Sequence, residues 1–464
     1  MGRLLVIGLD CATPQLVFDR WKDLLPNLTG IGERGARARL FSTIPPITVP
    51  AWTAMMTSKD PGTLGFYGFR NRKSYAYEDL YYANARYVKE KTVWNYLSRN
   101  RMKSLIFGVP QTYPPKPLNG AMVSSFLAPA KDAGYTYPPD IAAKLDEAAD
   151  GDYMIDVRDF RTDDKDWLLE SIYEMTEKRF KAFKRLYGEE EYDFAMMVEM
   201  GIDRIHHGFW RYFDEEHRLY EPGNKYEYAI RDYYVQLDQW IGDLLQILRE
   251  DDAVMVVSDH GAKGMHGAIC INEWLQEKGY LTLKEQPKEP TRLKTEMIDF
   301  EKTRVWGEGG YYARIFFNVE GREPKGQIPK EEYDSFRDAF IQELEAMPDE
   351  NGNQIGTRVF KPEDVYRSVK NIPPDLIAYL GNLDWRSAGS VGTGTIHLFE
   401  NDTGPDDANH AEEGILIMEF KDRPLKEIQE VQSIYDVAPT ILDYFGVQVP
   451  EDMIGISMLG EEKS

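Results

Sequence analysis

The chain has 464 residues, and its 55 lysines and arginines against 78 aspartates and glutamates leave a formal net charge of −23. This excess of negative charge argues against a nucleic-acid polymer or an anionic membrane surface as the main partner, because no basic face is evident. Hydrophobic residues make up 42% of the chain, which is enough for a large core and excludes global disorder. Two cysteines cannot build a disulfide framework, and no signal peptide or apolar run of membrane-spanning length is evident, so we expect a cytoplasmic protein.

Six short apolar runs, many of them rich in β-branched residues, predict β-strands. In chain order they are Leu4–Gly8, Ser104–Val109, Phe194–Glu199, Val254–Val257, Leu376–Leu380 and Gly414–Glu419. Continuous apolar runs of this length are typical of strands covered on both faces, as in a parallel sheet. Helical patterns lie between them, at Trp167–Tyr187 and Tyr226–Glu250. The alternation predicts an α/β fold that binds its ligand beyond the carboxyl ends of the strands.

Three segments interrupt the alternation, and we interpret them as insertions that cap the sheet edge. Residues 61–98 are rich in tyrosine and arginine, and residues 128–165 are irregular in part. Residues 285–370 carry proline, glycine and charged clusters, with one helix near Lys330–Glu345. The sequence therefore predicts one catalytic α/β domain over residues 1–464 that carries these three cap segments.

Aspartate and histidine residues gather near the ends of four predicted strands. In chain order they are Asp10, Asp203, His207, Asp259, His260 and His410. Asp203 and His207 are four residues apart, so a single helical turn places both on one face. Because the carboxyl ends of parallel strands meet at one edge of a sheet, these groups are expected to converge there. Aspartate and histidine suit Zn²⁺ or Mn²⁺, so the pattern predicts a metal site.

Each of these residues alone has a simple structural alternative. A lone aspartate after a strand often caps a helix, and a lone histidine is usually satisfied by hydrogen bonds. Only the combination favours metal binding. His206 adjoins His207, but the spacing from Asp203 favours His207 as the ligand. Cys11 directly follows Asp10, and we interpret it as a buried small residue rather than a reactive thiol.

Thr48 lies in a stiff segment, Pro45-Pro46-Ile47-Thr48-Val49-Pro50, that precedes a predicted helix beginning within Ala51–Thr57. A hydroxyl at a helix N-terminus lies beside free backbone N–H groups, which are a favourable site for a phosphate. The alternative is an ordinary threonine that caps the helix.

In this order, the motifs resemble those of the alkaline phosphatase superfamily and, within it, the type I phosphodiesterase/nucleotide pyrophosphatase family. The resemblance rests on Asp10, Thr48 in Pro-Ile-Thr-Val-Pro, Asp203-x₃-His207, Ser258-Asp259-His260-Gly261, His410 and the C-terminal segment Tyr435–Leu442. It covers nearly the whole core but not the insertions. It implies an alkaline-phosphatase-like three-layer sandwich around a mainly parallel sheet, with cap insertions.

The resemblance also implies two divalent metal ions, zinc or alternatively manganese. One ion would be bound by Asp10, Asp259, His260 and the Thr48 hydroxyl, and the other by Asp203, His207 and His410. Thr48 would attack phosphorus and form a covalent phospho-threonine, which water then hydrolyses. The expected function is hydrolysis of a small phosphorylated substrate, with a phosphodiester as the favoured class.

Departures from neighbouring families narrow this expectation. A sulfatase needs a modifiable cysteine or serine followed by x-Pro-x-Arg, and Thr48-Val49-Pro50-Ala51-Trp52 lacks both the modifiable residue and the arginine. Cofactor-independent phosphoglycerate mutases use serine as the nucleophile, whereas this chain has threonine at position 48, which disfavours a mutase. No dedicated arginine adjoins Thr48, which favours a diester over the more highly charged monoester. Phosphomonoesterase, phosphonate hydrolase and phosphomutase remain as alternatives, and a non-enzymatic metal-binding protein is disfavoured by the two complete ligand sets.

The substrate contacts are less clearly marked in the sequence. Nucleotide pyrophosphatases hold a phosphate oxygen with an asparagine, whose nearest counterpart here is Phe69, followed by Arg70 and Asn71. This departure leaves nucleotide specificity open. Arg70, Asn71 and Lys263 are candidate substrate contacts, with a solvated charge as the alternative for Arg70 and Lys263. Aromatic clusters at 66–69, 112–115 and 310–312 either wall a leaving-group pocket or simply pack.

Overall fold

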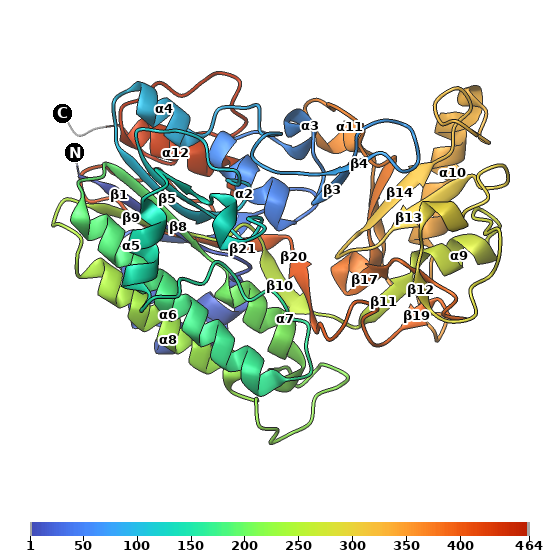
Figure 1. Ribbon diagram of the computed structural model, residues 1–464, viewed down its shortest axis with the longest axis horizontal. Coiled ribbons are helices and arrows are strands. Elements are labelled where there is room, and N and C mark those ends of the chain that lie inside the picture. The colour runs from blue at the N-terminus through green and yellow to red at the C-terminus, as the bar shows by residue number, and fades with distance from the viewer. Residues whose placement is uncertain (1, 462–464) are drawn as a thin grey trace.

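The computed structural model describes residues 2–461, and its largest element is a nine-stranded sheet with the order β22-β2-β21-β9-β1-β8-β5-β6-β7 (Figure 1). The parallel centre consists of β9 (Ala253–Val257), β1 (Leu4–Leu9), β8 (Phe194–Glu199), β5 (Ser104–Val109) and β6 (Gly120–Ser124). The flanking strands are β22 (Val431–Ser433), β2 (Ala36–Phe41), β21 (Glu413–Glu419) and β7 (Thr136–Tyr137). Of these, β21 runs antiparallel to both β9 and β2.

Burial on both faces explains why the apolar runs form this sheet. Every residue of β1, β5, β8 and β9 is buried, as expected for central parallel strands. Two predicted strands depart from the parallel arrangement. The run at Leu376–Leu380 forms β16 (Leu376–Tyr379) in a separate antiparallel sheet, and the run at Gly414–Glu419 forms the antiparallel strand β21.

Helices cover both faces of the large sheet, so the protein is a three-layer sandwich (Figure 1). One layer contains α5 (Ile141–Ala148), α6 (Lys165–Glu189) and α8 (Ala229–Leu245). The helix α1 (Pro26–Arg34) packs against α8 in the same layer. The other layer contains α2 (Thr48–Thr57), α4 (Val93–Arg99) and α12 (Val437–Tyr444). The predicted helices at Trp167–Tyr187 and Tyr226–Glu250 correspond to α6 and α8.

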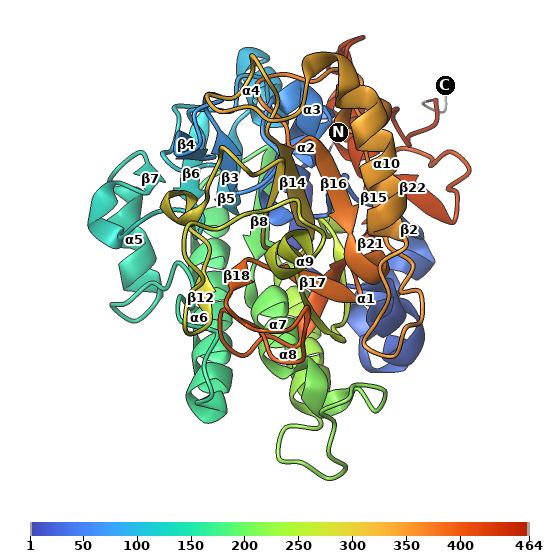
Figure 2. The same ribbon diagram turned by 90° about the vertical axis from the view of Figure 1, so that its right-hand side faces the viewer.

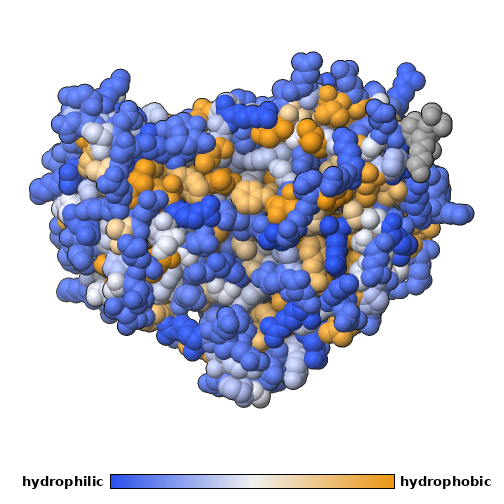
Figure 3. All heavy atoms as spheres, turned by 180° about the vertical axis from the view of Figure 1, so that it is seen from behind, coloured by the Kyte–Doolittle hydropathy of each residue, from blue (hydrophilic) through white to orange (hydrophobic). Residues whose placement is uncertain are grey.

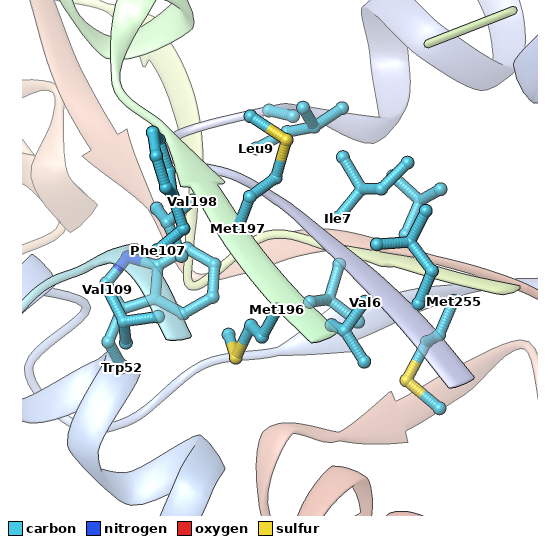
Figure 4. Packing of buried hydrophobic residues seen from close by; sticks show 14 of the residues in the cluster. Val6, Ile7, Leu9, Trp52, Phe107, Val109, Met196, Met197, Val198 and Met255 are labelled. Atoms are coloured by element: carbon cyan, nitrogen blue, oxygen red, sulfur yellow. The ribbon is translucent and has the colours of Figure 1, made fainter. Parts of the chain in front are cut away.

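Close packing fixes the position of α2 on the sheet. The ring of Trp52 is fully buried among side chains of the central strands (Figure 4). A Cβ atom added to Gly8 would lie 2.5 Å from the Trp52 ring and 2.8 Å from Val198 Cγ2, so the absence of a side chain at Gly8 allows α2 to approach β1. On the other face, Arg179 of α6 forms a fully buried ion pair with Glu199 at 2.9 Å.

A second lobe, residues 267–398, has its own hydrophobic cluster (right in Figure 1, facing the viewer in Figure 2). Its four-stranded antiparallel sheet has the order β13 (Val305–Glu308), β14 (Ala313–Phe317), β16 and β15 (Arg358–Phe360). Smaller sheets join β17 (Trp385–Ala388), β11 (Gly267–Cys270) and β19 (His397–Leu398), and pair β12 (Thr291–Arg292) with β18 (Ser390–Val391). Its helices are α9 (Ile271–Glu277), α10 (Tyr333–Glu345) and α11 (Pro362–Val365).

The segments interpreted as caps have different structures. Residues 285–370 fall within the second lobe, which begins before them and ends after them, and α10 matches the helix expected there. Residues 61–98 contain α3 (Pro61–Leu64) and the hairpin of β3 (Arg70–Arg72) with β4 (Leu80–Tyr82). Residues 128–165 contain β7 and α5.

The face of the molecule shown in Figure 3 is mostly hydrophilic, in keeping with the excess of acidic residues. Hydrophobic patches interrupt it mainly near its middle. Within residues 2–461, no helix combines the length and apolar character that a bilayer crossing requires.

Candidate metal centre and substrate pocket

Three parallel strands deliver acidic and histidine side chains to one edge of the sheet. Asp10 directly follows β1, and Asp259 and His260 follow β9. After β8, the chain enters α7 (Gly201–Phe213), whose first turns carry Asp203 and His207 on one face. Because β1, β8 and β9 are parallel neighbours, their carboxyl ends lie side by side.

His410 reaches the same edge by a different route. It lies on β20 (Ala408–Ala411), which pairs with β10 (Gly261–Gly264) directly after His260. The chain then enters β21, which runs antiparallel to β9. A residue that precedes an antiparallel strand lies at the edge where its parallel neighbours end, which explains why His410 joins the other groups.

The side chains form two adjacent groups of potential metal ligands. In the first, ligand atoms of Asp10, Asp259 and His260 lie within 4.8 Å of one another. In the second, the same holds for Cys11, Asp203, His207 and His410. The two groups meet where the rings of His260 and His410 stack, with their centroids 3.8 Å apart.

Buried atoms that lack partners show that these groups fit metal ions. Asp10 Oδ1, Asp259 Oδ2, His207 Nε2 and His410 Nε2 are all buried without a hydrogen-bond partner. Leaving a buried polar atom unpaired costs about 1–3 kcal/mol, and more for a charged group, so four together at one edge are unusual. Coordination of divalent cations would satisfy all of them, and carboxylate and imidazole donors suit zinc or manganese.

Charge repulsion and burial perturb the titration of these groups. Burial and the neighbouring Asp259 and Asp203 raise the pKa of Asp10 well above its usual range. Burial acts the same way on Asp203, but cationic neighbours led by His207 outweigh it and hold that pKa well below its usual range. Burial opposes protonation of His207 and His260, yet the surrounding carboxylates raise both pKa values to about 9. The site thus favours positive charge.

Hydrogen bonds donated by the Nδ1 atoms orient all three imidazoles. His260 Nδ1 lies 3.1 Å from the carbonyl oxygen of Gly261, and His410 Nδ1 lies 2.8 Å from that of Pro46. His207 Nδ1 lies 2.7 Å from Asp406 Oδ1. With Nδ1–H as the donor, each Nε2 carries the lone pair that a metal needs.

Sequence reasoning missed Asp406, and the signal that could have found it is faint. The carboxylate is fully buried, and it also accepts hydrogen bonds from Arg161 Nε and the Tyr311 hydroxyl, both at 3.0 Å. Two consecutive aspartates, Asp406 and Asp407, precede His410 by a few residues. Such a pair is usually solvated, so only the fold shows that one of them supports a candidate ligand.

Thr48 is the first residue of α2 and lies at the metal centre. Its side chain is buried, and Oγ1 lies 3.3 Å from His260 Nε2. One turn later, Trp52 Nε1 donates a hydrogen bond to Asp10 Oδ2 at 2.7 Å, which ties α2 to the same group of ligands. The first turn of α2 leaves backbone N–H groups without intrahelical partners.

A pocket of about 810 Å³ opens above Thr48, between the large sheet and the second lobe. Aromatic residues and arginines from both parts dominate its wall: Phe69, Arg70, Phe126, Phe160, Arg161, Arg204, Arg292, Tyr311, Tyr312, Arg314 and Arg386. Of these, the sequence singled out Arg70 and two of its aromatic clusters. The other arginines stand alone in the sequence and gave no signal.

Several residues considered from the sequence have partners elsewhere. Asn71 Oδ1 accepts the Tyr67 backbone N–H at 2.7 Å, and its amide group is thus held in a turn. Lys263 pairs with Asp384 at 2.5 Å and lines a different pocket. His206 Nε2 lies 3.1 Å from the Tyr234 hydroxyl.

Residues 4–406 match the sequence model of the family described as type I phosphodiesterase / nucleotide pyrophosphatase. The chain belongs to this family. The match covers both groups of candidate ligands except His410, which lies just beyond its end. Family members of this kind act as phosphoesterases, so the chain is an enzyme of the hydrolase type, and the described ligand groups agree with the metal dependence of the family.

Solved structures share the fold at low sequence identity. Human ectonucleotide pyrophosphatase / phosphodiesterase 5 is 13% identical, with a TM-score of 0.57 over 99% of this chain and 100% of that one. Phosphonoacetate hydrolase from Sinorhizobium meliloti 1021, in complex with phosphonoacetate, is 16% identical, with a TM-score of 0.58 over 92% of each chain. These similarities establish the alkaline-phosphatase-like fold. No curated protein matches this chain.

Proposed function

We propose that this protein is a metal-dependent phosphodiesterase that acts through a covalent phospho-threonine at Thr48. The observation that carries the proposal is the position of the Thr48 hydroxyl. It lies at the base of the pocket, 3.3 Å from His260 Nε2, beside two groups of ligands whose buried atoms lack partners. A hydroxyl so placed has the surroundings of an activated nucleophile.

Two divalent ions would occupy the two groups. Asp10, Asp259 and His260, with the Thr48 hydroxyl, would hold one ion. Asp203, His207 and His410 would hold the other. We propose zinc, with manganese as the second choice, because the donors are carboxylates and imidazoles. When bound, such ions lower the pKa of a coordinated hydroxyl and stabilise negative charge on a phosphoryl group.

Thr48 and the N-terminus of α2 would position the reacting groups. Thr48 Oγ1 gives up its proton to solvent and forms a bond to phosphorus, while the bond from phosphorus to the leaving oxygen breaks on the opposite side. The leaving group departs with a proton from solvent, and water then cleaves the phospho-threonine to restore Thr48. Free N–H groups in the first turn of α2 would bind the phosphoryl oxygens during both steps.

The charge balance of the pocket supports a diester. Arg161 pairs with Asp406 at 3.0 Å, and Arg204 pairs with Asp156 at 2.8 Å and also with Asp203. A third arginine, Arg386, lies 3.9 Å from the same Asp406 carboxylate. These arginines beside the candidate ligands are therefore all paired with carboxylates. A monoester brings one more negative charge than a diester, and the paired arginines are less able to offset it.

The wall that the second lobe contributes to the pocket favours a leaving group that is aromatic, anionic or both. It includes Tyr311, Tyr312, Arg292 and Arg386, and the Tyr311 ring stacks on that of His410 with the centroids 4.2 Å apart. We propose that the second lobe acts as the cap that selects this group, and that Arg70 is among the contacts. Cleavage of a phosphonate is the second candidate, because Arg292 and Arg386 would suit a small carboxylate-bearing substrate.

The decisive experiment combines metal analysis with turnover. Purified protein would be assayed on a chromogenic phosphodiester, a monoester and a phosphonate ester, alongside Thr48→Ala. Thr53→Ala is a matched control, because Thr53 is equally buried one turn later on α2 and its hydroxyl bonds to the Val49 carbonyl. We expect about two metals per chain and a loss of roughly 10³-fold or more in kcat for Thr48→Ala only.

Two results would overturn this function. One is an active protein that retains full turnover after complete removal of divalent metals. The other is a Thr48→Ala variant that turns over the diester as fast as the Thr53→Ala variant.

A further inference from the structure

Cys11 lies inside the second group of candidate metal ligands. It directly follows Asp10 at the end of β1, and its side chain is fully buried. Its Sγ lies within 4.8 Å of a ligand atom of each of Asp203, His207 and His410. The thiol contacts the Gly261 carbonyl oxygen at 3.5 Å, which is a weak hydrogen bond.

The atoms that surround this sulfur need a cation. His207 Nε2 and His410 Nε2 are buried and have no hydrogen-bond partner. Their Nδ1 atoms are held by Asp406 and by the Pro46 carbonyl oxygen, so both Nε2 lone pairs are directed into the group that contains Cys11. These two unpaired nitrogen atoms therefore indicate a cation site whether or not Cys11 binds the ion.

The coordination chemistry of the group also leaves room for sulfur. Asp203, His207 and His410 supply three donors, whereas zinc in proteins takes four ligands and can expand to five. A thiolate is the donor that most strongly favours zinc over manganese or magnesium. The backbone of Cys11 has a φ of 69°, a left-handed conformation that glycine adopts without cost, yet this position carries a side chain directed at the metal group.

We propose that Cys11 is a thiolate ligand of the ion held by Asp203, His207 and His410, and that it makes this site selective for zinc. The inference rests on the proposed function only in requiring a metal at this site. On binding, the Cys11 thiol releases its proton to solvent and its sulfur donates an electron pair to the ion, with no change in oxidation state. A substrate oxygen would then bind by expansion of the coordination from four ligands to five.

The test uses the other cysteine as its control. Cys270 is also fully buried, but it packs with Ala268 and Ala388 in the second lobe. Wild type, Cys11→Ser, Cys11→Gly and Cys270→Ser would be loaded with zinc and measured by X-ray absorption. Cobalt-loaded samples would be measured by near-ultraviolet absorption, where a thiolate bound to cobalt gives a charge-transfer band. Cys11→Gly keeps the experiment open if the serine variant folds poorly, because glycine tolerates the left-handed backbone.

We expect one sulfur at about 2.3 Å from one of the zinc ions and a cobalt charge-transfer band, in wild type and Cys270→Ser. Both signals should vanish in the Cys11 variants, and their zinc affinity at one site should fall roughly tenfold or more, while manganese affinity changes little. Wild-type protein that binds two zinc ions without a sulfur neighbour would overturn the inference and leave the proposed function standing. A chain that binds no divalent metal at all would overturn both.

Discussion

Replacement of Asp406 by asparagine tests how the metal centre is oriented. The Asp406 carboxylate bonds to His207 Nδ1 at 2.7 Å and to Arg161 Nε and the Tyr311 hydroxyl at 3.0 Å each. Burial opposes ionisation of Asp406, but the positive charges of His207 and Arg161 outweigh it and hold its pKa below the usual range. Asp406→Asn preserves the shape, removes the negative charge and places an NH₂ group against one of three donors.

The expected loss follows from the role of the carboxylate. Removal of an outer-shell partner of a ligating histidine typically weakens metal binding by about 10–100-fold, which corresponds to roughly 1.4–2.7 kcal/mol. Competition titrations of zinc against a chelating dye would measure this change for the Asp203, His207 and His410 site. Thermal unfolding of the same samples would separate lost affinity from lost stability.

Asp407→Asn is the matched control for this measurement. Asp407 is as deeply buried as its neighbour, but its carboxylate lies 3.6 Å from Arg211, and only its backbone N–H contacts the His207 carbonyl oxygen. Its zinc affinity should stay within about twofold of wild type, in line with a site that lacks an outer-shell contact. If Asp406→Asn binds zinc as tightly as wild type, or Asp407→Asn loses as much, the orienting role of Asp406 is refuted.

Three further outcomes follow from burial and charge. In metal-free protein the pKa values of His207 and His260 are raised from 6.5 to about 9. Protonation of these two histidines therefore stabilises the folded state fully below pH 6.5, and this contribution is lost as the pH rises to about 9. Urea unfolding of chelator-treated protein should show this decline in the free energy of unfolding, and a flat profile would contradict it. Gly8→Ala should lower the free energy of unfolding by about 1–3 kcal/mol, because the new Cβ would lie 2.5 Å from the buried Trp52 ring. Gly188→Ala is the control, because its new Cβ meets open space, and it should be neutral or stabilising by up to ~1 kcal/mol. Equal losses for the two variants in denaturant titrations would count against this packing argument. Arg179→Met should cost about 3–5 kcal/mol, because it leaves a buried carboxylate unpaired, and a double variant that also replaces that carboxylate with an apolar group should recover part of the loss.

Local sequence was sufficient to place four of the five central parallel strands, whereas β6 was not predicted. Ser104–Val109 and Phe194–Glu199 were predicted with the bounds that β5 and β8 have. Strands covered on both faces need an unbroken apolar run, and such a run is visible without any tertiary information. The same locality made Asp203 and His207 recognisable as a pair, because four residues along a helix return to the same face.

The small sheets of the second lobe were beyond local reasoning. The run at Leu376–Leu380 reads like a central parallel strand, yet β16 pairs in antiparallel fashion with β14 and β15 around a second hydrophobic cluster. An apolar run indicates that a strand will be buried, but it does not indicate which of the two hydrophobic clusters the strand will join. Arg292 and Arg386 line the pocket for the same reason, since the second lobe brings them to the edge of the large sheet.

The sequence by itself therefore predicted most of the central strands, the family and a set of candidate metal ligands, because each depends on residue type and short-range spacing. Tertiary structure decided how those residues meet. His410 joins the centre because β21 runs antiparallel, and Asp406 contacts His207 across 199 positions of the chain. Cys11 changes from a small core residue to a candidate ligand for the same reason. Such contacts depend on strand direction and on close approach of distant segments, which no local pattern encodes.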